Sequence, residues 1–218
     1  PLQLGAELFG VNSSQADIEI VELLVEMLRS FGLDRLHVDL GHMGIFLGLA
    51  ESENLDTAAQ DRLAEVIISR ARDDVARVCD ELAVSPQARE MFILMSSCSG
   101  EVDTLSKVVD QLANAPENSR TAIENLLNIA SSLKQRLPGL RLYYDLAALK
   151  GQSYHNGLVF SVYLPGAGRA IASGGRYDDI GGVFGRARPA TGFSLDLRAV
   201  SRLVSQENNH AETICVNY

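Results

Sequence analysis

Apolar residues recur every three to four positions along residues 13–32, which is the spacing of an amphipathic helix. The expected apolar face consists of Ile20, Leu24, Met27, Leu28 and Phe31. Ser14 and Asp17 fit a capping box for the free N–H groups of the first turn, and Gly32 is expected to end the helix. Residues 36–40 then alternate apolar and polar side chains, which predicts a half-buried strand.

Helical spacing dominates from residue 51 to residue 137. Breaks fall near Ser85, Cys98 and Asn114. Pro86 and Pro116 fit helix boundaries, because proline fixes φ and disfavours helix in the residue before it. We therefore predict an all-helical insertion over residues 51–137.

Strand-like composition returns after this insertion. Residues 158–164 and 169–173 are separated by Pro-Gly-Ala-Gly, which predicts a β-hairpin with a four-residue turn. Residues 190–204 run from a strand-like start into a helix, and residues 212–218 resemble a strand that is cut short.

These patterns predict an α+β fold, in which a mixed sheet domain is interrupted by the helical insertion. Strands on both sides of the insertion must pair with each other to hide their edges. The expected core is therefore discontinuous, formed by residues 1–50 and 138–207, and residues 208–218 would begin a further C-terminal segment.

The amino-acid composition limits the classes of function that fit this chain. The 218 residues are 46% hydrophobic and 22% charged, and no apolar run reaches the roughly 18 residues that span a bilayer. The N-terminal residues lack the basic start and apolar stretch of an export signal, so a cytoplasmic location and no membrane contact are expected. A net charge of −9 disfavours extensive binding to nucleic acid.

The cysteines and the glycine-rich segment give no sign of a metal or nucleotide site. Cys79, Cys98 and Cys215 are far apart in sequence and have no histidine at metal-ligand spacing, which favours buried free thiols. Residues 182–185 match neither a P-loop nor a dinucleotide fingerprint. We expect no metal and no cofactor.

One group of residues has the chemistry of a small-ligand site. Two adjacent glycines allow a ligand to approach the backbone, an arginine offers a planar fork for a carboxylate or phosphate, and aromatic side chains can close over a flat ring. An amide and a carboxylate near the N-terminus can accept N–H donors. The candidate residues are Gln3, Glu7, Tyr154, His155, Gly174, Gly175, Arg176 and Tyr177.

A purely structural interpretation stands beside this one. Gly174 and Gly175 would then form a tight turn, and Arg176 a surface ion pair. His155 would make an ordinary polar contact, and Tyr177 would pack on the sheet.

Five blocks, QLGAELFG, ADIEIVELL, KGQSYHNGLVF, ASGGRYD and TGFSLDLRAV, resemble in order the signature blocks of the histidyl-tRNA synthetase catalytic domain. The resemblance covers residues 1–50 and about 138–204. It implies a class II synthetase-like fold, a mixed, mainly antiparallel sheet flanked by helices. The first class II motif and the leading arginine of the second are absent. We therefore expect the natural protein to begin before Pro1 and to continue past Tyr218.

The chain departs from the synthetase pattern where ATP and the reacting carboxylate would bind. Lys150 stands where the synthetase has an arginine, and His155 where it has a second tyrosine. Arg198 and Ala199 replace the glutamate and the ATP-binding arginine of the third motif. Loss of that cation removes electrostatic stabilisation that adenylation requires.

The chain keeps the residues that match the synthetase's contacts to histidine, while those for ATP are replaced. In this combination it resembles the regulatory subunits of ATP phosphoribosyltransferase. This resemblance implies a non-catalytic protein that binds histidine, self-associates, activates a short catalytic subunit, takes part in feedback inhibition and has no tRNA partner. An atypical histidyl-tRNA synthetase and a structural module without a ligand are the alternatives.

Overall fold

The computed structural model describes residues 2–149, 155–178 and 187–210, and for residues 205–210 the backbone alone. Seven strands in these ranges form one sheet, in the order β1-β7-β6-β5-β2-β4-β3. The strands are β1 (Gln3–Phe9), β2 (His37–His42), β3 (Ser99–Glu101), β4 (Arg141–Asp145), β5 (Leu158–Tyr163), β6 (Ala172–Arg176) and β7 (Ala190–Asp196). Neighbouring strands are antiparallel except for the parallel pair β2–β4, so the predicted mixed, mainly antiparallel sheet is confirmed.

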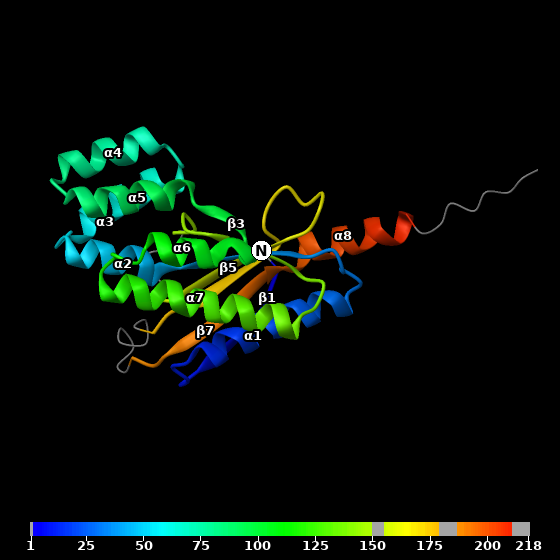
Figure 1. The fold of residues 1–218 in the computed structure, drawn as a ribbon. Helices are drawn as coiled ribbons and strands as arrows, with labels where there is room; N and C mark the ends of the chain where they lie inside the picture. The colour runs from blue at the N-terminus through cyan, green and yellow to red at the C-terminus, as the bar shows by residue number, and fades with distance from the viewer. Residues whose placement is uncertain (1, 150–154, 179–186, 211–218) are drawn as a thin grey trace, which may run out of the picture.

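Helices cover one face of this sheet. The helices are α1 (Ser14–Ser30), α2 (Met43–Ser52), α3 (Thr57–Ile68), α4 (Arg72–Glu81), α5 (Pro86–Ser97), η1 (a 3-10 turn, Val102–Thr104), α6 (Leu105–Gln111), α7 (Glu117–Arg136) and α8 (Leu197–His210). Helices α1 and α7 lie across the sheet, whereas α3, α4 and α5 gather at one side of it (Figure 1). Helix α1 packs against β7, and α7 packs against β2 and α2.

The apolar stripe of α1 explains its position. Leu24 and Leu28 are fully buried, as the helical spacing predicts. The helix ends before Gly32, whose φ of +84° is the left-handed conformation that glycine adopts readily. The predicted capping box is wrong: Ser13 is the N-cap and makes no capping bond with its side chain, while Asp17 is buried.

Residues 51–137 are mainly helical, with two differences from the prediction. Helix α5 begins at Pro86, where the Ser85 hydroxyl accepts a hydrogen bond from the N–H of Ala88, and α7 begins after Pro116. However, the segment also contains β3, which pairs with β4, so it is not all-helical. Three residues are too few to show an alternating pattern, which is why β3 was missed. Helix α7 also belongs to the layer that covers the sheet.

Strands β5 and β6 form the predicted antiparallel hairpin, but their connection is longer than four residues. It runs from residue 164 to residue 171, with left-handed backbone at Gly166 and Gly168. Gly174 and Gly175 lie within β6 and pair with β5 and β7, so they form no turn. The strand expected over residues 212–218 lies outside the described residues. No helix among the described residues is long and apolar enough to cross a bilayer.

Candidate functional site: a cleft on the uncovered face of the sheet

The sheet face opposite α1 and α7 carries a row of polar side chains. Pairing places Asp39 beside Ser161, Ser161 beside Ser173, and Ser173 beside Ser194. Because directly opposed residues of antiparallel strands share a face, these four side chains point to the same side. Gly5 of β1 continues the row beyond Ser194.

A second row of residues lies on the same face, two positions along each strand from the first row. It is built largely from glycine. Gly175 pairs with Gly192, and Gly192 pairs with Glu7. A Cβ added at Gly175 would lie 2.7 Å from Cδ2 of His155, and one added at Gly192 would lie 2.9 Å from Cγ of Glu7. The His155 ring and the Glu7 stem therefore lie against neighbouring glycines, and larger residues there would displace them.

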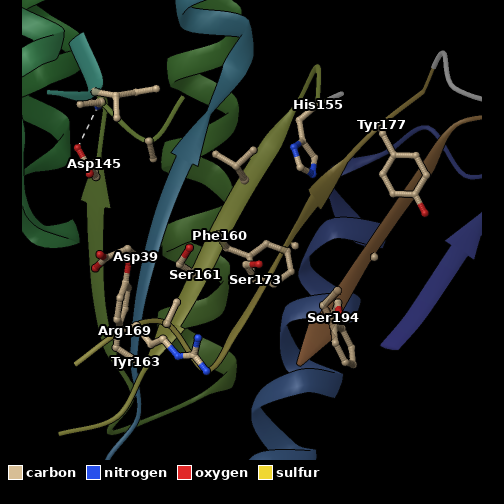
Figure 2. A pocket seen from close by; sticks show the side chains of 18 of the residues that line it. Asp39, Asp145, His155, Phe160, Ser161, Tyr163, Arg169, Ser173, Tyr177 and Ser194 are labelled. Carbon is tan, nitrogen blue, oxygen red and sulfur yellow. Dashed lines mark hydrogen bonds between the residues drawn. The ribbon is translucent and has the colours of Figure 1, made fainter. Parts of the chain in front are cut away.

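These two rows form the floor of a cleft of about 890 Å³. Glu7, His155 and Tyr177 line one end, and Asp39, Tyr163 and Asp145 line the other. Figure 2 shows His155 and Tyr177 apart from Asp39, Tyr163 and Asp145, with Ser161 and Ser173 between them. The first end combines a carboxylate that can accept N–H donors with two aromatic rings, which suits a flat ring bearing N–H groups.

The second end is held by charged and aromatic contacts. Arg70, from the connection between α3 and α4, donates to Asp145 over 2.6 Å. Burial raises the pKa of Asp145, against the hydrogen bond that its carboxylate accepts from the N–H of Ala147. Beside it, His37 Nε2 lies 2.6 Å from Asp39 Oδ1, and the His37 ring stacks on Tyr143 with centroids 4.2 Å apart. The helical segment therefore closes this side of the cleft.

The predicted site residues are not all in the cleft. Glu7, His155, Gly174 and Tyr177 line it, and Gly175 lies directly beneath His155. Gln3 is exposed at the far end of β1 and is not among the lining residues. Tyr154, like Lys150, lies outside the described residues.

Arg176 differs most from the expectation, because its guanidinium lies on the helix-covered face. Its Nε and Nη2 contact the carboxylate of Asp17 in α1 at 3.1 and 3.0 Å, and the two side chains are only 8% and 4% exposed. We expected a ligand contact or a surface ion pair for Arg176, whereas the observed ion pair is buried. A single aspartate among the apolar residues of α1 was the available signal for this partner.

The residues that match the third synthetase motif are hydrogen-bonded to an aspartate of the same chain. Asp196 Oδ1 accepts hydrogen bonds from the backbone N–H groups of Arg198 and Ala199 at 3.0 and 3.1 Å, which caps α8. The other oxygen accepts from Arg169 at 3.0 Å. These backbone hydrogen bonds, that of Ala199 above all, lower the pKa of Asp196. A carboxylate of the chain itself thus occupies N–H groups at the start of this helix.

Nothing in the described residues indicates a metal site. No group of three or more histidine, cysteine, aspartate or glutamate side chains is suitably placed among them. Cys79 is a buried free thiol and Cys98 is a partly buried one, while Cys215 lies outside the described residues. Burial raises the pKa of Cys79 to about 11, so this thiol stays protonated at neutral pH.

Comparison with known proteins shows which family has this fold. The histidyl-tRNA synthetase family model matches residues 1–200. The chain belongs to this family. Among family relatives, the ATP phosphoribosyltransferase regulatory subunit of Alkalilimnicola ehrlichii is 44% identical over 92% of this chain, and that of Stutzerimonas stutzeri is 44% identical over 95%. The chain spans about half the length of these curated relatives, 50% and 52% respectively.

Solved structures of family members share the fold. A protein from Bacillus halodurans described as an ATP phosphoribosyltransferase regulatory subunit/histidyl-tRNA synthetase is 25% identical, with a TM-score of 0.79 over 93% of this chain and 52% of that one. The ATP phosphoribosyl transferase (HisG:HisZ) complex from Thermotoga maritima contains a chain with a TM-score of 0.67, 20% identity, and coverage of 88% of this chain and 65% of that one. The predicted class II synthetase-like fold is thereby confirmed.

Proposed function

We propose that the full-length protein is the regulatory subunit of ATP phosphoribosyltransferase. In this role it has no catalytic activity of its own; it activates the short catalytic subunit in the first step of histidine biosynthesis and takes part in feedback inhibition by histidine. The observation that supports this most directly is the 44% identity, over more than nine tenths of this chain, to proteins of that name.

The cleft is the proposed place for histidine. Glu7 can accept an N–H of the imidazole, and His155 and Tyr177 can flank the ring over the glycine floor. Bound histidine regulates only to the extent that it binds one assembly state more tightly than another. Coupling of this kind is typically about 1–3 kcal/mol, or roughly 5- to 150-fold in affinity.

The surroundings of α8 support a role without adenylation. Ala199 offers no cation for a phosphate, and Asp196 places a carboxylate at the helix start, where an anion would otherwise be favoured. The nearby Arg169 already pairs with Asp196. The helix start therefore differs from a nucleotide site in its occupied N–H groups and in the alanine at position 199.

Size analysis of the full-length protein, with and without a short ATP phosphoribosyltransferase catalytic subunit, tests the proposal. We expect self-association alone, a mixed complex with the catalytic subunit, and activity of the catalytic subunit only in the mixture. Added histidine should lower that activity, and tRNA should not bind. Absence of both a mixed complex and activation would contradict the proposal.

An atypical histidyl-tRNA synthetase is the second candidate, because the matching family model carries that name. Histidine-dependent ATP–pyrophosphate exchange separates the two candidates. Exchange and tRNA charging by the full-length protein would favour the synthetase, whereas histidine binding without exchange is the expected result.

A further inference from the structure

Arg176 connects the end of β6 to residues 11–17 and to residues 156–157 beneath one end of the cleft. Besides its pair with Asp17, its Nη2 donates to the carbonyl of Ser13 at 2.9 Å and its Nη1 to the carbonyl of Val11 at 3.3 Å. Nη1 also lies 3.2 Å from Asp178 Oδ1. Each contact is made on the helix-covered face or at the edge of β6, so the guanidinium is fully engaged away from the cleft.

The stem and backbone of the same residue hold the segment that carries His155. A Cβ added at Gly157 would lie 2.7–3.0 Å from Cδ, Cγ and Cβ of Arg176, so the arginine stem lies directly against this glycine. The Arg176 carbonyl accepts a hydrogen bond from the N–H of Asn156 at 3.1 Å. Arg176 therefore holds Asn156 through its carbonyl and Gly157 through its stem, next to His155 in the chain.

The neighbouring residues fix Tyr177 in the same way. The N–H of Tyr177 donates to the carbonyl of Ala190 at 2.8 Å. Asp178, the partner of Arg176 Nη1, accepts from the N–H of Ala190 at 3.3 Å, and its own N–H donates to the Asn156 side chain at 3.3 Å. The contacts that hold the segments of His155 and Tyr177 therefore meet at Arg176, whose carbonyl and stem hold Asn156 and Gly157 and whose guanidinium holds Asp178.

We propose that Arg176 is a positioning residue, which acts from the covered face of the sheet to place His155 and Tyr177 around a ring-shaped ligand on the open face. This rests on the proposed histidine site. It assigns the arginine of the Gly-Gly-Arg-Tyr block to the orientation of the ligand-facing residues and not to contact with the ligand.

Two substitutions in the full-length protein separate this role from general stability. Arg176→Lys keeps a positive charge for Asp17 but loses the fork that reaches Ser13, Val11 and Asp178. Gly157→Ala pushes the arginine stem from the other side and leaves every charge in place. Glu7→Gln is the matched control, because it changes a group that faces the cleft and leaves the buried pair intact.

The first measurement is amide hydrogen exchange of the ligand-free protein. We expect Arg176→Lys and Gly157→Ala to raise exchange at least tenfold at residues 156–158 and 177–178, with exchange in β2 and β4 unchanged. Glu7→Gln should leave all four segments unchanged. General destabilisation would instead raise exchange in β2 and β4 as well, and that result, or unchanged exchange at 156–158, would overturn the proposal.

The second measurement is calorimetric titration with histidine and with imidazole alone. Both positioning variants should lose about tenfold in affinity for each ligand, because the ring contacts are displaced. Wild-type affinity in both variants would overturn the proposal. If the wild-type protein binds neither ligand, the proposed histidine site fails, and hydrogen exchange alone then decides the role of Arg176.

Discussion

The two faces of the sheet are built from alternate residues of the same strands, yet they tolerate charge very differently. On the covered face, Leu40 and Val162 are fully buried, and the ion pair of Asp17 with Arg176 is also buried. On the open face, Asp39 and three serines line a cleft. Packing against α1 and α7 makes each charge on the covered face dependent on its partner, whereas solvent can replace a lost partner on the open face.

The largest effect should follow from breaking the buried pair. Asp17→Ala leaves the guanidinium of Arg176 buried without its main counter-charge, and we expect a loss of about 3–5 kcal/mol in stability. Asp39→Ala, which removes a carboxylate from the open face, is the control and should cost less than about 1 kcal/mol. Melting temperatures of the two full-length variants test this difference, and equal losses would contradict it.

The second largest effect should be a loss of stability in acid, caused by a histidine on the covered face. Burial lowers the pKa of His42 to about 4, with a smaller effect from the charge of Arg176. Below pH 6.5 the unfolded chain takes up a proton that the folded chain does not, so stability falls as the pH drops from about 6.5 to about 4, by about 3 kcal/mol. Asp17 has the opposite effect on stability at low pH. Because burial raises its pKa, the folded chain takes up a proton there before the unfolded chain does.

Melting temperatures between pH 7 and pH 4 measure this loss. His42→Asn is the matched variant, because an amide oxygen can still accept the hydrogen bond that His42 Nδ1 receives from the N–H of Gly44. It should flatten the pH dependence over this range. The same slope in the wild type and the variant would assign the acid sensitivity to another group.

A smaller loss of stability is expected from a substitution where two helices of the covered face touch. A Cβ at Gly48 in α2 would lie 2.6 Å from Oγ and 2.7 Å from the backbone nitrogen of Ser119 in α7. Gly48→Ala should therefore separate the two helices and cost about 1–3 kcal/mol. Thermal unfolding measures this loss, and an unchanged melting temperature would mean that α2 and α7 adjust freely.

The smallest effect belongs to the serine row of the open face. Ser173 is exposed, and removal of its hydroxyl leaves the packing of the covered face intact. Ser173→Ala should change stability by less than about 0.5 kcal/mol. A loss as large as that expected for Gly48→Ala would show that the open face contributes more to stability than its exposure indicates.

Sequence patterns predicted the helices and strands well. They did not predict all the contacts that side chains make on the two faces of the sheet. Alternation in residues 36–40 and helical spacing in residues 13–32 each reflect burial that is local in sequence, and both elements were found. The partner of Arg176 is 159 residues away in the chain, and no local pattern specifies such a contact. The capping prediction for Asp17 failed for the same reason, since tertiary burial overrode the local role.

The candidate site was predicted in part. The pairing of Gly175 with Gly192 brings together two segments that were recognised separately, and the register that aligns them with Glu7 became visible only in the folded sheet. The far end of the cleft was not predicted, because Asp39, Asp145 and Arg70 come from three unrelated segments. Their common location depends on the helical segment folding back against β4.

The parallel pair β2–β4 has a kinetic consequence. His37 is aligned with Arg141, so this pairing joins segments about a hundred residues apart and closes a loop that contains α2 to α7. Such a closure is entropically costly and slows folding. The intervening helices can form from local contacts first, which shortens the effective loop. Refolding should therefore show early helix signal and a later, slower phase in which β2 and β4 pair.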